Sequence, residues 1–226
     1  MGALLIPAEP DYADDSERVV VQALHAQLPD DAVILHGVRI TDDEHGDVEI
    51  DVIVLLPDLG AAVIEVKGGY VQYRGGRFIQ TGAQEREIDP VHQARKGLWS
   101  LQRYLERQPD WSRGPVRGAW LVAFPYTSVQ SPMGPQAPRE AIIGQGDLGD
   151  AAGIAARRLG QAHESRPTAD GWVDAALVAL THADGDPVQV PARTLARMRE
   201  IQEATESRRF LIRATSLIPR MEFIGS

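Results

Sequence analysis

Residues 48–67, Val-Glu-Ile-Asp-Val-Ile-Val-Leu-Leu-Pro-Asp-Leu-Gly-Ala-Ala-Val-Ile-Glu-Val-Lys, decide the fold, because they predict two apolar strands joined by a tight turn. Strand side chains alternate between the two faces of a sheet, so Glu49 and Asp51 point the same way on the first strand. For the same reason, Glu65 and Lys67 point together on the second strand. Carboxylates within apolar strands must be paired, hydrogen-bonded or bound to a cation, because an isolated buried charge costs several kcal/mol. This stretch is therefore the candidate functional site.

The composition is typical of a globular protein and is compatible with a cytoplasmic location. The 226 residues suffice for one sizeable domain, alone or with an appendage, and 43% of them are hydrophobic, as in ordinary globular proteins. The chain has neither a run of eighteen apolar residues nor a secretory signal, so we expect no membrane span and a cytoplasmic location. It has no cysteine, and its six histidines lack zinc-ligand spacing. Any bound metal would therefore be held by oxygen, which indicates magnesium, manganese or calcium.

The charges divide unevenly along the chain. The net charge of −9 argues against a nucleic-acid partner, because phosphate binding depends on Lys and Arg. However, residues 1–60 hold fourteen Asp and Glu against two Arg, whereas residues 70–120 hold nine Arg and Lys against five acids. This division fits a metal-binding pole beside an anion-binding one, and solvated surface charge is the alternative.

Further helices and strands are expected around the central pair of strands. Residues 1–12 show no periodicity and predict a flexible arm. In chain order, the other predicted elements are a helix from Asp14 to about Leu28, an edge strand at 33–40, a hairpin at 70–80, a helix from Asp89 to about Arg107, buried strands at 118–124 and 140–144, and helices near 148–163 and 170–182.

Two polar residues on the predicted helices are further candidates. Glu17 shares a helix face with Val21 and Leu24, so its carboxylate could point at the sheet. Alternatively, it is a first-turn glutamate that complements the helix dipole. Gln93 lies off the apolar stripe in the first turn of the second long helix, where it faces either a cleft or solvent.

The predicted hairpin carries two aromatic and two basic side chains, Tyr70, Tyr73, Arg74 and Arg77. These side chains could contact a nucleic-acid backbone or stack on its bases. Cross-strand pairing on a sheet surface is an equally good interpretation.

Two carboxylates on neighbouring strands suit a magnesium ion, which prefers hard oxygen ligands and keeps several waters. Such a metal lowers the pKa of bound water and stabilises charge on a phosphate, which is the metal-assisted route to phosphodiester hydrolysis. Lys67, two residues after Glu65, could orient or deprotonate the attacking water, or neutralise the phosphate. The structural alternative is an ion pair of Lys67 with Glu65 or Asp51 that holds the sheet together.

The order Asp51, a turn, then Glu65-Val-Lys67 resembles the PD-(D/E)xK nuclease superfamily. More narrowly, three motifs resemble the nuclease-related domain, NERD, over about residues 13–125: Glu49-Ile-Asp51, Val-Ile-Glu65-Val-Lys67-Gly-Gly and Asp89-Pro90-Val-His-Gln93. The chain departs from the family pattern at Asp89, where Asn is usual, and at Phe78, where Trp is usual.

The resemblance implies a role for each candidate residue. Asp51 and Glu65 would be metal ligands, and Glu17 would be the first-helix carboxylate that completes the metal site. Lys67 would be the catalytic lysine and Gln93 the positioning glutamine. The resemblance leaves the role of Glu49 open.

The resemblance also implies an architecture and an activity. We expect an α/β fold of restriction-endonuclease type, with a mixed central sheet flanked by helices, over residues 13–185, followed by a C-terminal helical extension. Residues 186–226 would form a helical linker and the start of a truncated helicase domain, because Arg-Met-Glu-Phe-Ile-Gly-Ser resembles the strand before a helicase phosphate loop. The expected function is a nuclease that uses Mg²⁺ or Mn²⁺ and acts on DNA, as part of a helicase-linked DNA-processing or defence protein. The alternatives are an inactive module that binds nucleic acid or a partner, and a structural domain that supports a helicase.

Overall fold

The computed structural model of the chain describes residues 2–42, 46–82, 84–109, 111–162 and 169–181. These residues all belong to one compact unit, Met1–Gln189. The helical linker and the truncated helicase domain predicted for residues 186–226 lie outside the described residues. The same holds for the predicted C-terminal helical extension.

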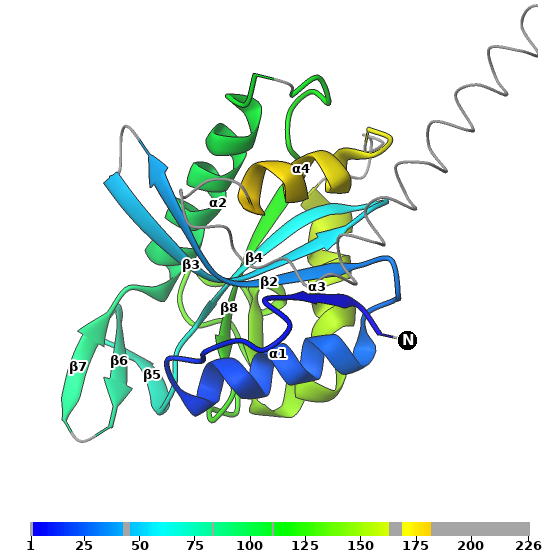
Figure 1. The fold of residues 1–226 in the computed structure, drawn as a ribbon. Helices are drawn as coiled ribbons and strands as arrows, with labels where there is room; N and C mark the ends of the chain where they lie inside the picture. Colours follow the sequence, from blue (N-terminus) through cyan, green and yellow to red (C-terminus); the bar gives the residue numbers. More distant parts are fainter. Residues whose placement is uncertain (1, 43–45, 83, 110, 163–168, 182–226) are drawn as a thin grey trace, which may run out of the picture. The chain divides into compact units, whose positions relative to one another are not determined.

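Six strands form the central sheet, in the order β1-β2-β3-β4-β8-β9 (Figure 1). They are β1 (Leu4–Ile6), β2 (Val33–Asp42), β3 (Gly46–Leu56), β4 (Gly60–Val66), β8 (Gly118–Phe124) and β9 (Ile142–Gly144). The β2-β3 and β3-β4 pairs are antiparallel, whereas β1-β2, β4-β8 and β8-β9 are parallel. The predicted mixed sheet is confirmed.

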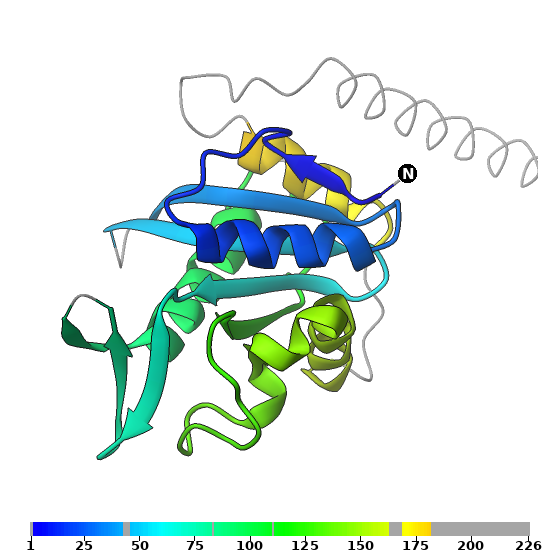
Figure 2. The same cartoon turned by 90° about the horizontal axis from the view of Figure 1, so that it is seen from below.

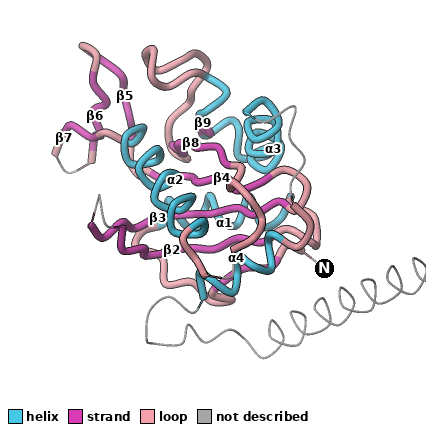
Figure 3. Tube along the Cα trace, turned by 90° about the horizontal axis from the view of Figure 1, so that it is seen from above, coloured by secondary structure: helices cyan, strands magenta, loops and turns pink. Residues whose placement is uncertain are grey.

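Helices cover both faces of this sheet, which explains why its central strands are apolar on both sides. They are α1 (Asp15–Gln27), α2 (Pro90–Glu106), α3 (Ala151–Ala162) and α4 (Trp172–Thr181). Figure 2 shows α1 and α3 on one face, and Figure 3 shows α2 and α4 on the other. All seven residues of β4 are buried between these layers. The arrangement is consistent with the restriction-endonuclease-like fold that the resemblance implied.

Both long helices begin at an aspartate, as the sequence predicts. Asp14 is the N-cap of α1 and accepts hydrogen bonds from the backbone N–H groups of Ser16 and Glu17. Asp89 is the N-cap of α2 and accepts a hydrogen bond from the N–H of His92, with Pro90 as the first helical residue. These caps fix where Glu17 and Gln93 lie.

A second, three-stranded sheet projects from the central one after β4 (Figure 1). It consists of β5 (Tyr70–Arg74), β6 (Arg77–Thr81) and β7 (Glu85–Ile88). The hairpin formed by β5 and β6 is the predicted one. The sequence analysis missed β7, because its Glu-Arg-Glu-Ile sequence is too polar to stand out as a strand.

Two predictions for the N-terminal part of the chain are wrong. Residues 1–12, predicted as a flexible arm, contain the strand β1. Ile6 of this strand is buried, and so is Ala3, which precedes it. The strand predicted as an edge is β2, and β1 pairs with it in parallel and occupies the edge instead. A three-residue strand is too short to show a period, and its parallel partner lies about thirty residues further along the chain.

Gly60→Ala is expected to destabilise the protein by about 3 kcal/mol or more, because the turn into β4 has no room for a side chain. Gly60 has a φ of +127°, and a Cβ there would lie 2.5 Å from the carbonyl oxygen of Arg117. Gly75→Ala is the matched control, since Gly75 also has a positive φ, +60°, but open space around it. It should cost only about 1–2 kcal/mol. Urea unfolding of both variants measures the difference, and equal losses would contradict the steric argument.

Candidate active site

Asp51 and Glu65 are brought together where the β3-β4 ladder ends. The last pair of this ladder is Val52 with Ile64, so Asp51 and Glu65 are the next residues outward on the two strands. Beyond the ladder, the Asp51 side chain continues the contact between the strands, because its Oδ2 accepts a hydrogen bond from the backbone N–H of Val66 at 2.8 Å. One carboxylate oxygen of Asp51 is thus used by the fold.

Glu65 is buried on the sheet face that α2 covers. Only 5% of it is exposed. Its ladder partner on β8 is Val122, which packs in the same apolar cluster as Val91 and Ala94 in the first turns of α2. A glutamate in such surroundings needs a compensating charge.

Lys67 supplies one such charge. Its Nζ lies 2.5 Å from Glu65 Oε1, and its backbone N–H donates to the carbonyl of Ala123 at 2.9 Å. The backbone bond fixes the residue beside β8, and the side chain folds back onto Glu65. The predicted pairing of Glu65 and Lys67 on one face is confirmed.

The single ammonium does not balance the buried carboxylates. Burial, followed by the negative charge of Asp51, raises the pKa of Glu65 to about 7, although Lys67 acts in the opposite direction. The pKa of Asp51 is also raised, mainly by burial, against the Val66 hydrogen bond and the Lys67 charge. The charge of Glu17 raises the pKa of both groups, and that of Glu49 raises the pKa of Asp51. The site therefore holds an excess of negative charge that a cation would relieve.

Glu17 lies near this pair but binds elsewhere. Its Oε2 is 2.8 Å from Nε2 of His36 and accepts the backbone N–H of Ala13 at 3.2 Å. The ring of Tyr12 meets the His36 ring edge-on, with centroids 4.8 Å apart. The Glu17 charge is nevertheless close enough to raise the pKa of both Asp51 and Glu65.

His36 is a site residue that the sequence analysis did not single out. It lies on β2 with only 6% of its side chain exposed, and its ladder partner is Val52, next to Asp51. The sequence pattern of the strand gives no sign that His36 contacts the carboxylate of Glu17, which lies nineteen residues earlier on a helix. The contact depends on how α1 crosses the sheet.

Gln93 and Glu49 are less closely associated with the cluster. Gln93 is exposed in the first turn of α2, and in the described ranges its side chain makes no hydrogen bond to Asp51, Glu65 or Lys67. Glu49 is exposed on β3 and pairs with Arg39 at 3.4 Å. Its charge makes the smallest of the contributions that shift the pKa of Asp51.

The donor set fits a hard divalent cation, although the three predicted carboxylates do not form one ligand group. Asp51 and Glu65 offer oxygen atoms in a negative, largely buried position, which suits magnesium or manganese. Within the part of the chain that the structure describes, no group of three or more His, Cys, Asp and Glu is arranged to hold a metal. Glu17 turns toward His36 instead.

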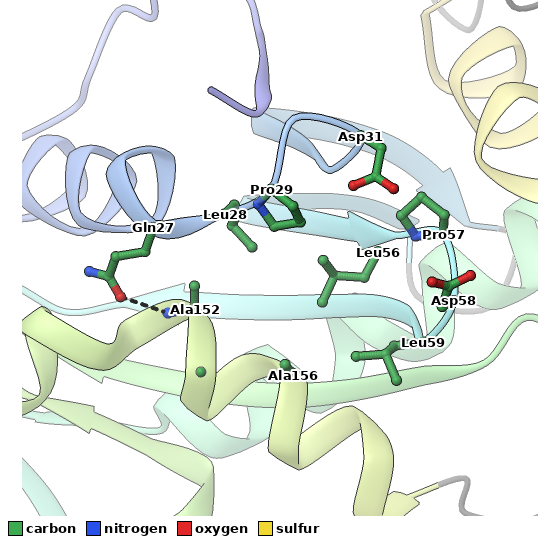
Figure 4. Close-up of a pocket in the computed structure, with 11 residues that line it drawn as sticks. Gln27, Leu28, Pro29, Asp31, Leu56, Pro57, Asp58, Leu59, Ala152 and Ala156 are labelled. Carbon is green, nitrogen blue, oxygen red and sulfur yellow. Dashed lines mark hydrogen bonds between the residues drawn. The ribbon is translucent and has the colours of Figure 1, made fainter. Parts of the chain in front are cut away.

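A pocket of about 500 Å³ lies at the other end of the same two strands (Figure 4). Its lining includes Leu56 and Asp58 at the β3-β4 turn, Leu28 after α1, and Ala152 and Ala156 of α3. None of the candidate residues lines this pocket. The clustered carboxylates, rather than the pocket, form the candidate active site.

The hairpin side chains are largely used within their own sheet. Arg74 pairs with Glu85, and Arg77 pairs with Glu87 at 2.8 Å. The Tyr73 ring packs edge-on against Phe78, whereas Tyr70 stays half exposed. These contacts favour the structural interpretation of the hairpin.

Comparison with known proteins gives one match. The family model described as NERD, nuclease-related domain, matches residues 13–124, a range that contains every candidate residue named above. No curated protein and no solved structure matches the chain. Among the described residues, no helix has both the length and the apolar character needed to cross a membrane.

Proposed function

Because residues 13–124 belong to the nuclease-related domain family, we propose that the chain is a magnesium-dependent nuclease that hydrolyses phosphodiester bonds in DNA. The observation that carries this proposal is the cluster of Asp51, Glu65 and Lys67. Burial raises the pKa of both carboxylates, the charge of Asp51 raises that of Glu65 further, and one lysine offsets only part of these effects. Groups whose pKa is shifted by burial together with a specific charged neighbour are typical candidates for functional sites.

Asp51 and Glu65 are the residues that would hold the cation. Asp51 keeps one oxygen available, since the other accepts the Val66 N–H. When bound, magnesium or manganese would lower the pKa of a coordinated water and offset the charge that develops on the phosphate. The cation would also favour the ionised form of Glu65.

Lys67 would act on the reacting groups directly. Its ammonium lies beside Glu65, where it can orient the attacking water or neutralise the phosphate. As a neutral amine, Lys67 could instead accept the proton of that water. Glu17, held by His36, would contribute negative charge at the edge of the site. Gln93 would position the substrate from α2, whose first turns lie on the face of Glu65.

The expected helicase partner and cytoplasmic location stay predictions. The helicase would make the nuclease part of a larger DNA-processing or defence protein. The structure describes none of residues 186–226, on which the helicase prediction rests.

Asp51→Ala is expected to abolish cleavage of linear and circular DNA in magnesium or manganese, because it removes a ligand and the link between β3 and β4. The wild-type protein should cleave in these metals and should be inactive in EDTA. Asp47→Ala is the matched control, since Asp47 lies exposed on the same strand and, among the described residues, its side chain accepts a hydrogen bond from Thr41 alone. A gel assay with all three proteins tests the proposal, and EDTA-resistant cleavage by Asp51→Ala would refute it.

One observation favours a second candidate function, an inactive nuclease-fold module that binds nucleic acid or a partner. Glu65 is paired with Lys67 and Glu17 with His36, so two of the three predicted metal ligands already have partners. DNA binding by the wild-type protein without cleavage in any of these metals would support this alternative.

A further inference from the structure

Trp120 on β8 is contacted by two arginines that come from different helices. The guanidinium carbon of Arg95, on α2, lies 4.8 Å from the centroid of the Trp120 ring. That of Arg158, on α3, lies 5.5 Å from it. Both distances are within the range of cation–π contacts, so the ring holds two positive charges close together.

The end of the neighbouring strand explains how both helices reach one ring. The ladder between β8 and β9 covers only Val122 to Phe124, so in the described residues Trp120 stands beyond it. Figure 3 shows α3 beside this edge of the sheet, while α2 covers the face. Arg158 can therefore approach around the edge, and Arg95 approaches from above.

These two arginines lack carboxylate partners among the described residues. In the part of the chain that the structure describes, the Nε of Arg158 is buried without a hydrogen bond, and Arg95 donates only to the carbonyl of Gln136, at 3.5 Å. By contrast, the adjacent Arg157 pairs with Asp150 at 2.7 Å. A second arginine beside the same indole adds repulsion between two like charges, which a bound anion would relieve. In a chain with a net charge of −9, this local positive excess stands out.

Trp120, and with it the two arginines, lies close to the candidate active site. On the neighbouring strands β4 and β8, Val63 pairs with Trp120 and Glu65 pairs with Val122. Trp120 and Glu65 therefore point to the same face of the sheet, on adjacent strands and two residues apart in register. Strand spacing and rise place their Cα atoms about 8 Å apart. At a rise of about 3.4 Å per nucleotide, this is the length of two to three nucleotides of one strand.

We propose that Arg95, Trp120 and Arg158 form a phosphate-binding subsite for the sugar-phosphate backbone beside the scissile bond. The guanidinium fork matches phosphate oxygens, and the indole fixes the orientation of both forks. This inference rests on the proposed function, since it assigns the subsite to the nucleic acid that Asp51 and Glu65 would cleave.

The test measures DNA binding in EDTA, so that binding is separated from hydrolysis. The probes are fluorescently labelled 20-nucleotide DNAs, single-stranded and duplex, with anisotropy recorded over a range of NaCl concentrations. The double variant Arg95→Gln/Arg158→Gln should bind about tenfold more weakly or worse. Its slope of log K against log salt should be smaller by about 1.4 to 1.8, the value for two lost phosphate contacts.

Two further variants control for folding and for general charge. Arg157→Gln removes one exposed charge from the same helix turn and should leave affinity and slope almost unchanged. Arg95→Lys/Arg158→Lys keeps both charges and should retain most of the salt slope, although it loses the fork geometry. Thermal melting of each variant reports whether it is folded.

The inference is overturned if Arg95→Gln/Arg158→Gln binds DNA with the affinity and salt slope of the wild type. It is also overturned if Arg157→Gln loses as much affinity as the double variant, or if the wild type does not bind DNA. A cleavage assay with magnesium distinguishes this failure from that of the proposed function. Unchanged KM for the double variant with intact cleavage overturns the subsite and leaves the nuclease standing. Binding that depends on the two arginines without any cleavage supports the subsite and refutes the nuclease.

Discussion

Glu65→Gln is expected to lower DNA cleavage by about 10²–10³-fold or more and, at the same time, to raise the free energy of unfolding at pH 8. The loss of activity follows because a neutral amide is a poor ligand for a hard cation. The gain in stability follows because the folded protein buries an ionised Glu65 beside Asp51 at this pH. A residue retained at a cost in stability is typical of a functional site.

The sign of the pH dependence follows from the raised pKa. The pKa of Glu65 rises from 4.5 in the unfolded chain to about 7 in the folded protein. The folded state therefore holds the proton more tightly, and its contribution to stability is fully present below about pH 4.5 and lost as the pH rises to about 7. At 1.36 kcal/mol per pKa unit, the loss amounts to about 3 kcal/mol at most.

Urea unfolding at pH 5 and pH 8 measures this effect as a difference between Glu65→Gln and the wild type. The difference in favour of the variant should be larger at pH 8 than at pH 5 by about 1–3 kcal/mol. Glu49→Gln, an exposed glutamate on the neighbouring strand, should show no such pH-dependent difference. A Glu65→Gln protein that is less stable than the wild type at pH 8 would contradict the account of an unbalanced site.

Lys67→Met is expected to lower cleavage by about 10²–10⁴-fold, even where the cation site is filled. The Lys67 charge lowers the pKa of Glu65, so removing it should strengthen the competition of protons with metal at neutral pH. Manganese binding should consequently weaken at pH 7 and recover at pH 9. Cleavage should stay low at both pH values, because the group that acts on water or phosphate is missing.

Manganese affinity and cleavage rate at pH 7 and pH 9 separate these two effects. Lys96→Met is the control, since Lys96 is the only other lysine of the chain and lies on α2. Full recovery of cleavage by Lys67→Met at pH 9 would mean that Lys67 only tunes the charge of Glu65. That result would remove Lys67 from the proposed catalytic residues.

Local sequence signals predicted the parts of the fold that depend on neighbouring residues. Asp14 and Asp89 mark helix starts because a carboxylate satisfies free N–H groups in the first turn. The strands on either side of the 57–60 turn were equally clear, because each has a continuous run of apolar residues beside the turn. These signals need no knowledge of distant residues.

The elements that were missed or misplaced depend on contacts between distant segments. β1 is defined by parallel pairing with β2, and β7 by pairing of a polar segment with β6. Neither leaves a period in its own sequence. The assignment of β2 as an edge strand failed for the same reason, because the edge is decided by β1.

The candidate site shows the same division. Alternation along β4 placed Glu65 and Lys67 together, and the structure agrees. The Glu17 contact with His36 depends on the crossing of α1 over the sheet, which no local pattern encodes. The arginines around Trp120 likewise come from two helices that are far apart in sequence.

The central claim is that Asp51 and Glu65 hold a divalent cation for phosphodiester hydrolysis. Calorimetric titration of manganese into the wild type, Asp51→Ala and Asp47→Ala at pH 8 tests it most directly. The account predicts one binding event in the wild type and in Asp47→Ala, and none in Asp51→Ala. Equal manganese binding by Asp51→Ala and the wild type, or none by any of the three proteins, would contradict it.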